Sequence, residues 1–134
     1  KIYLIFLLGI LLIVGCCKTQ DTTQTQDTRT QGNIIEITSD IFSPNELRIN
    51  AGDTVTWVSK DTKDSWPASA VHPTHEKYPG SGITKCGTAE EKNIFDACKG
   101  LKPGESWSFT FTQKGTWGYH DHLNLGRTGK IIVE

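Results

Sequence analysis

The clearest alternation of apolar and polar side chains runs from residue 105 to 112, with the sequence ESWSFTFT. On an extended strand, Trp107, Phe109 and Phe111 fall on one face, and serine and threonine side chains fall on the other. Weaker patterns of the same kind predict five more strands, at residues 34–38, 46–50, 53–59, 116–123 and 129–133. Turn-forming residues separate these runs, and so the pattern predicts an all-β sandwich or barrel.

One long segment breaks this pattern. Residues 72–100 carry no strand signal, and at most one helical turn is predicted near residues 89–95. We therefore expect a long insertion loop between the strands, in a single domain that spans residues 33–134. A domain of about 100 residues is of ordinary size for a β-sandwich.

The first residues predict export. Residues 2–14 are entirely apolar, shorter than the roughly 20 residues that span a bilayer but suited to the apolar region of a signal peptide. The stretch from Ile13 to Cys16 resembles a bacterial lipobox, which predicts a signal over residues 1–15 and lipidation of Cys16. The protein would then be a lipoprotein anchored to a membrane, in the periplasm or on the outer cell surface. The alternatives are an uncleaved anchor and a cysteine that follows a signal by chance.

A tether is expected between the lipid and the domain. Residues 16–32 are rich in threonine and glutamine, and from residue 18 onward they contain no aliphatic or aromatic side chain. Such a segment cannot bury apolar surface, which predicts disorder. The signal, the tether and the domain at residues 33–134 therefore account for the whole chain.

Cys86 and Cys98 both lie in the expected insertion. In an exported domain an oxidising compartment favours a disulfide between them. The rival interpretation is a pair of thiolate metal ligands, which the absence of a short CxxC spacing disfavours.

The charge pattern excludes some classes of partner. The formal net charge is -1, and acidic and basic residues are mixed along the chain, which leaves no basic stripe for nucleic acid. No nucleophile with a base, no paired catalytic carboxylates and no phosphate-binding loop are evident. Whether the protein is an enzyme stays open, although the sequence favours a binding or electron-transfer protein.

Several motifs together resemble the cupredoxins, the plastocyanin-like copper proteins. They follow the order of that family over nearly all of residues 34–133: residues 42–47 (FSPNEL), 49–57 (INAGDTVTW), 101–106 (LKPGES), 109–111 (FTF), 115–120 (GTWGYH) and 129–133 (GKIIV). The resemblance implies a Greek-key sandwich or barrel of about seven or eight strands, copper as cofactor and electron transfer as the role.

The copper ligands of a blue-copper protein are not all present. The resemblance places the family's cysteine where this chain has Asp121, and its first histidine around residues 64–66, which read DSW. The chain also contains no methionine, the family's usual additional ligand. These departures argue against a thiolate-bound blue site.

All four histidines occur instead in two tight pairs, His72 with His75 and His120 with His122. Residues two apart on a strand share a face, so His120 and His122 can converge on one ion if the insertion folds over them. The same alternation warns that the two histidines could face away from the usual copper position, which the resemblance puts on the side of Asp121.

Imidazole nitrogen suits copper best among divalent ions, with zinc as an alternative. We therefore predict one copper ion held by these four histidines, with Asp121 and Glu76 as residues that orient them.

The predicted function is copper binding or delivery, or electron transfer, with a redox or copper-handling protein as partner. Two other classes stay open. One is a metal-free module on the cell surface, in which the histidines only hydrogen-bond and pack. The other is a subunit of an oligomeric enzyme, because the HxH pair is similar to those of multicopper oxidase domains.

Overall fold

The computed structural model of the protein describes residues 32–134. The signal predicted at residues 1–15, the lipidated Cys16 and all but the last residue of the predicted tether lie outside the described residues. These three expectations therefore stay predictions.

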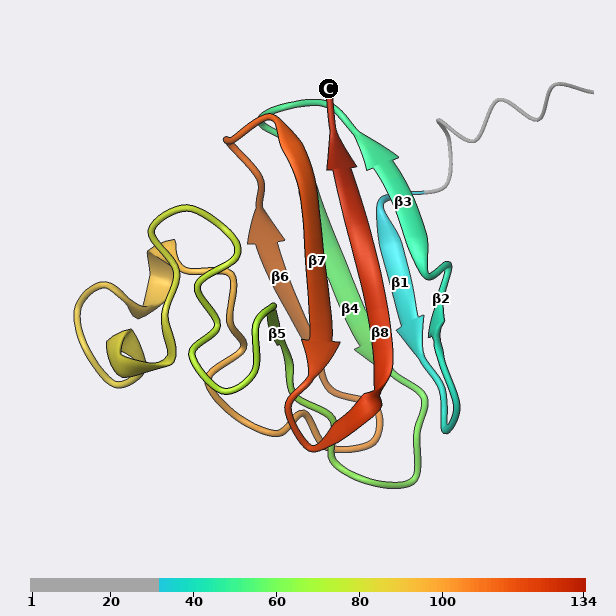
Figure 1. Cartoon of the computed structure of the whole chain (residues 1–134). Coiled ribbons are helices and arrows are strands. Elements are labelled where there is room, and N and C mark those ends of the chain that lie inside the picture. Colours follow the sequence, from blue (N-terminus) through green and yellow to red (C-terminus); the bar gives the residue numbers. More distant parts are fainter. Residues whose placement is uncertain (1–31) are drawn as a thin grey trace, which may run out of the picture.

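Eight strands form two four-stranded sheets that pack face to face (Figure 1). The first sheet has the order β2 (Phe42–Ser43), β1 (Ile34–Ile37), β4 (Thr54–Ser59) and β6 (Ser106–Thr110). The second has the order β3 (Glu46–Ile49), β8 (Asn124–Val133), β7 (Gly115–Asp121) and β5 (Pro67–Ser69). The pairs β1 with β4 and β3 with β8 are parallel, and the other neighbours are antiparallel. The predicted all-β sandwich is confirmed.

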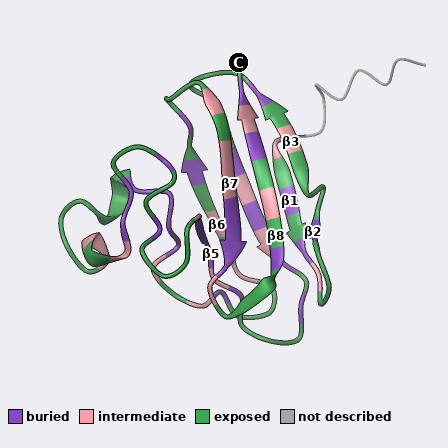
Figure 2. Cartoon of the chain, in the orientation of Figure 1, coloured by how far each residue is buried: buried purple, intermediate pink, exposed green. Residues whose placement is uncertain are grey.

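The core lies between the two sheets, and side-chain alternation explains which residues enter it (Figure 2). On β4, Val55 and Trp57 are fully buried, whereas Thr56 on the outer face hydrogen-bonds to Ser108 of β6. The Trp57 ring contacts aromatic rings from both sheets, including Tyr119 at a centroid distance of 5.4 Å. Burial of these large aromatic side chains is the main force that holds the sheets together.

Three features differ from the expectation. Strands β2 and β5 are too short for a periodic pattern, and all three residues of β5 are buried, which leaves no alternation to recognise. Strand β8 begins at Asn124, well before residue 129, because its first half pairs with β7 in a hairpin. Backbone pairing defines that half, since its side chains do not alternate.

The insertion projects beside the sheets and contains two short 3-10 helices, η2 (Ile83–Lys85) and η3 (Glu91–Asn93) (Figure 1). The second lies where a helical turn was expected, near residues 89–95, whereas the first was not expected. Tyr78 and Phe95 anchor the insertion, because both side chains are buried in the core. Over residues 32–134, none of the helices has the length and apolar character needed to cross a membrane.

Candidate metal centre

Strand β7 presents His120 on the outer side of its sheet. The preceding residue, Tyr119, points into the core, where its ring packs against Phe42 at 4.7 Å and Trp57 at 5.4 Å. Because successive side chains of a strand point to opposite faces, His120 projects away from the core. It is nevertheless only 5% exposed, because the insertion covers that face.

His122 lies beyond the strand. The register of β7 against β8 shifts between His120 and Asp121, and β7 ends at Asp121. The following turn carries His122, whose N–H donates a hydrogen bond to the Trp66 carbonyl at 2.8 Å. The strand predicted over residues 116–123 therefore ends earlier, and the turn, not a shared strand face, brings His122 toward His120.

The insertion supplies the other two histidines just after β5. His75 has a positive φ of 60° and donates its backbone N–H to the Val71 carbonyl at 2.7 Å, which folds the loop back on itself. Tyr78 fixes the far side of this loop, since its N–H donates to Ser69 Oγ at 2.8 Å and its ring is buried. The loop thus folds over β5 and β7 with His72 at its edge.

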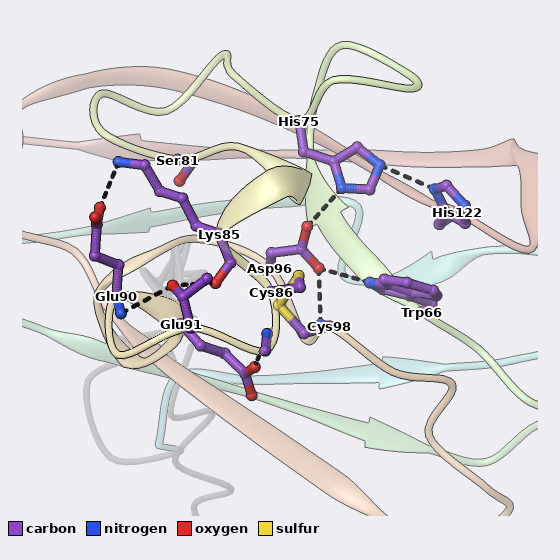
Figure 3. Close-up of a disulfide and its surroundings, with 12 residues drawn as sticks. Trp66, His75, Ser81, Lys85, Cys86, Glu90, Glu91, Asp96, Cys98 and His122 are labelled. Carbon is purple, nitrogen blue, oxygen red and sulfur yellow. Dashed lines mark hydrogen bonds and ion pairs between the residues drawn. A yellow bond between two sulfur atoms is a disulfide. The ribbon is translucent and has the colours of Figure 1, made fainter.

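All four histidines meet in one cluster. A ligand atom from each of His72, His75, His120 and His122 lies within 4.8 Å of the others. His75 Nε2 and His122 Nδ1 lie 3.0 Å apart, within hydrogen-bond distance, and Figure 3 marks this interaction. His75 and His120 are buried, His122 is half-buried and His72 is exposed. The predicted convergence of the two pairs is therefore present in the fold, with one imidazole open to solvent.

His120 is well suited to bind a cation. Its Nε2 atom is buried and has no hydrogen-bond partner within the described part of the chain. Burial first, and then repulsion of a second positive charge by the nearby His75 and His72, lower the pKa of His120 to about 4. The imidazole is therefore neutral at physiological pH, which leaves the nitrogen lone pair free for a metal ion.

Asp96 orients His75, a role that the sequence did not indicate. Its Oδ2 accepts a hydrogen bond from His75 Nδ1 at 2.5 Å, and both side chains are fully buried (Figure 3). Its Oδ1 accepts from Trp66 Nε1 at 2.6 Å. Burial alone would raise the pKa of Asp96, but these hydrogen bonds hold it below its ordinary value. The charged carboxylate keeps Nδ1 protonated and directs Nε2 of His75 into the cluster.

The predicted disulfide between Cys86 and Cys98 is confirmed. It lies close to the cluster, because the backbone N–H of Cys98 donates to Asp96 Oδ1 at 2.8 Å (Figure 3). A cross-linked pair does not offer the two thiolates of the rival interpretation.

A buried ion-pair network occupies the position where the resemblance places the family's copper ligands. Arg127 Nη1 donates to Asp121 Oδ2 at 2.9 Å and to Ser65 Oγ at 2.7 Å, and Nη2 donates to Asp61 Oδ2 at 2.5 Å. Asp121 stands at the cysteine position, and Ser65 lies within the stretch expected to hold the first histidine. Both carboxylates of this network are engaged by the guanidinium, so a metal cation here would have to displace Arg127 to reach them.

Neither predicted orienting carboxylate contacts an imidazole. Asp121 Oδ1 accepts the backbone N–H groups of Trp66 and Leu123, both at 2.9 Å, and its charge only moderates the lowered pKa values of His120 and His122. Glu76 is exposed and has no hydrogen bond or ion pair to a histidine among residues 32–134. The hydrogen-bonded carboxylate of the cluster is Asp96 instead.

Comparison with known proteins gives one consistent family. A family model for copper binding proteins of the plastocyanin/azurin family matches residues 33–134. Plastocyanin from Scenedesmus fuscus is 31% identical over 96 residues, which are 70% of this chain and 87% of that protein. Amicyanin from Paracoccus denitrificans is 28% identical over 101 residues, which are 75% of this chain and 64% of that protein. The chain spans 52% of the length of the chloroplastic plastocyanin of Silene latifolia, to which it is 31% identical over 94 residues.

Solved structures agree on the fold. A purple cupredoxin from Nitrosopumilus maritimus matches with a TM-score of 0.57 at 22% identity, over 75% of this chain and 98% of that one. An oxidized amicyanin mutant matches with a TM-score of 0.55 at 24% identity, over 75% of this chain and 80% of that one. At these identities the likeness concerns the arrangement of the two sheets.

Proposed function

Because the chain belongs to the plastocyanin/azurin family of copper-binding proteins, we propose that it binds one copper ion through His72, His75, His120 and His122. The observation that carries this proposal is the cluster of four imidazoles whose ligand atoms lie within 4.8 Å of one another, together with the buried Nε2 of His120, which has no hydrogen-bond partner among residues 32–134. An unpaired buried polar atom costs free energy, and a bound cation would offset that cost.

The ligand chemistry favours a centre of the type 2 kind. A bound copper ion would supply a Cu(II)/Cu(I) couple in which four nitrogen ligands stabilise Cu(II). The protein's part is to hold three imidazoles rigidly in or against the sheet while His72 faces solvent. Such a centre favours copper binding or delivery over fast electron transfer. Zinc is the main competing ion, since imidazole also suits it.

The Arg127 network supports this location over the interior one. Arg127 is 3% exposed, and both of its carboxylate partners are buried with it. Both carboxylates are already paired with Arg127, so a cation placed there would have to displace the guanidinium to gain a ligand. The histidine cluster on the other side of β7 offers imidazole nitrogens instead. Copper would therefore bind outside the position where the resemblance places the family's copper, although the sandwich itself is of the family's kind.

We further propose that the protein is exported and attached to a membrane through lipid on Cys16. This rests on the apolar run at residues 2–14 and on the stretch from Ile13 to Cys16. The exposed His72 edge would then meet a redox or copper-handling partner outside the cytoplasm. Labelling with a radioactive fatty acid tests the anchor, and loss of label in Cys16→Ser is the expected result.

Single histidine variants test the ligand set. We expect His75→Ala and His120→Ala to lose most of the bound copper after dialysis, as measured by elemental analysis. Glu76→Gln is the matched control, because it changes an exposed carboxylate next to His75 that contacts no imidazole. Full copper in both histidine variants would refute the site, and no copper in the unaltered protein would favour a metal-free module.

A further inference from the structure

Asp96 joins the histidine cluster to the disulfide. One carboxylate oxygen accepts from His75 Nδ1 at 2.5 Å, and the other accepts from the Cys98 backbone N–H at 2.8 Å. Only one residue separates Asp96 from Cys98, and the disulfide ties Cys98 to Cys86. A single buried carboxylate thus lies between a covalent cross-link and a candidate metal ligand (Figure 3).

The backbone of Cys98 has an unusual conformation next to the cross-link. Its φ is 54°, in the left-handed region that residues other than glycine rarely adopt. On the preceding side, the Ala97 N–H is held by the Pro67 carbonyl at 3.0 Å, so the chain up to Ala97 is fixed to β5 independently of the bridge. Without the bridge, nothing covalent opposes a flip of the Ala97–Cys98 peptide, which would bring Cys98 to negative φ and turn its N–H away from Asp96.

We propose that the Cys86–Cys98 disulfide controls the copper affinity of the histidine cluster through Asp96, a positioning residue for His75. The proposal rests on the proposed copper site. A dithiol reductant would open the bridge: the S–S bond gains two electrons and two protons to give two thiols, and the donor becomes a disulfide. The freed Cys98 no longer donates to Asp96 Oδ1, which then keeps only the hydrogen bond from Trp66 Nε1 at 2.6 Å, and the carboxylate holds the ring of His75 less firmly.

Linkage makes this coupling reciprocal. If the closed bridge strengthens copper binding, bound copper must make the bridge harder to open by the same factor. The protein would hold copper while oxidised and release it when a dithiol donor reduces it. The bridge is accessible for such a reaction, because Cys86 and Cys98 are both partly exposed.

A double-mutant cycle tests the coupling on the full chain. The variants are Asp96→Asn, the pair Cys86→Ser with Cys98→Ser, and all three changes together. The serine pair imitates the open bridge without thiols, which would themselves reduce or bind copper. Competition with a chelator of known affinity measures the Cu(II) dissociation constant of each, and circular dichroism establishes that each is folded.

We expect Asp96→Asn to weaken Cu(II) binding by about 10- to 100-fold, as loss of a partner of a ligating histidine usually does. The serine pair should weaken it by about 5-fold or more in the original background. In the Asp96→Asn background the serine pair should change it by less than about 2-fold, because the link is already broken. Glu91→Gln is the control, since this exposed carboxylate caps Gly87 in the same loop without reaching a histidine.

Two outcomes overturn the inference. If the variant with both cysteines changed to serine binds copper as tightly as the unaltered protein, the bridge does not control copper affinity. An equal loss in both backgrounds shows that the bridge acts by general loosening and not through Asp96. If the serine pair does not fold, Asp96→Asn still tests the first link, and unchanged affinity there refutes it. Failure of the unaltered protein to bind copper would instead refute the proposed function.

Discussion

Among single residues, His120 shows most directly how burial changes an imidazole of the cluster. Its Nε2 has no partner in the described residues, and its pKa of about 4 keeps the ring neutral well below neutral pH. The protein therefore stores an unfavourable interaction at this atom. Binding of a cation relieves it, so that stability and metal affinity are linked at one nitrogen.

This stored interaction predicts a pH dependence for the metal-free protein. In the unfolded chain His120 takes up a proton near pH 6.5, but in the folded protein it does so only near pH 4. The unfolded state binds more protons between these values, so stability should fall as the pH is lowered from about 6.5 to 4. The loss is on the order of 3 kcal/mol, since one pKa unit corresponds to about 1.4 kcal/mol.

Denaturant unfolding at pH 7.5 and pH 4.5 measures this effect. His120→Ala should show a clearly smaller difference between the two pH values. His122, whose pKa burial also lowers, keeps part of the effect in that variant. An equal pH dependence in both proteins would contradict the assignment to His120.

Arg127 gives a second prediction for a single residue. Arg127→Met would leave Asp61 and Asp121 buried without their shared cation. We expect a loss of about 3–5 kcal/mol in the free energy of unfolding, the usual cost of breaking a buried ion pair from one side. Chemical denaturation measures it.

Arg48→Met is the matched control. Arg48 also pairs with two carboxylates, those of Glu46 and Glu134, but its side chain is 62% exposed. Exposed pairs of this kind contribute about 1 kcal/mol or less. A similar loss of unfolding free energy in both variants would mean that the buried pairs of Arg127 stabilise the sandwich no more than exposed ion pairs do.

Among the elements, the β7–β8 hairpin sets the position of the cluster. Tyr119 of β7 faces Gly129 of β8, and a Cβ atom at Gly129 would lie 2.5 Å from the Tyr119 ring. This close approach lets the Tyr119 ring fill the core directly behind His120. Glycine is required here for space, since no positive φ is involved.

Gly129→Ala should therefore destabilise the protein by about 1–3 kcal/mol through overpacking. Gly126→Ala in the same hairpin is the control, because the nearest atom to its added Cβ would be Asn124 Oδ1 at 3.6 Å. Thermal unfolding measures the stability of each variant. Equal stability would contradict the tight packing of Tyr119 against β8.

In the whole molecule, the sequence predicts the sandwich well because its longer strands alternate. Strands β4 and β6 place Trp57 and Phe109 in the core as their period of two requires. Strand β5 shows no such period because it is buried on both faces. Its position depends on pairing with β7, which only the folded structure provides.

The candidate site is partly predictable for the same reason. The two histidine pairs stand out in the sequence as a metal-binding signal, and one of them belongs to a recognisable strand. Asp96 and Arg127 do not stand out, since each is a lone charged residue whose role depends on distant partners. Asp96 is 21 residues from His75, and Arg127 is 66 residues from Asp61. The contact between Asp96 and His75 forms when the insertion folds over β7. The contact between Arg127 and Asp61 forms when the two sheets come together.

We propose that copper binds at the histidine cluster and not at the interior position beside Arg127. Electron paramagnetic resonance of the protein loaded with Cu(II), recorded with its optical spectrum, tests it most directly. We predict a Cu(II) signal split by nitrogen ligands and one copper ion per chain. We expect no intense absorption band at about 600 nm, because such a band marks thiolate ligation. An intense band there, or an unchanged nitrogen-split signal in a variant that lacks both His120 and His122, would contradict the account.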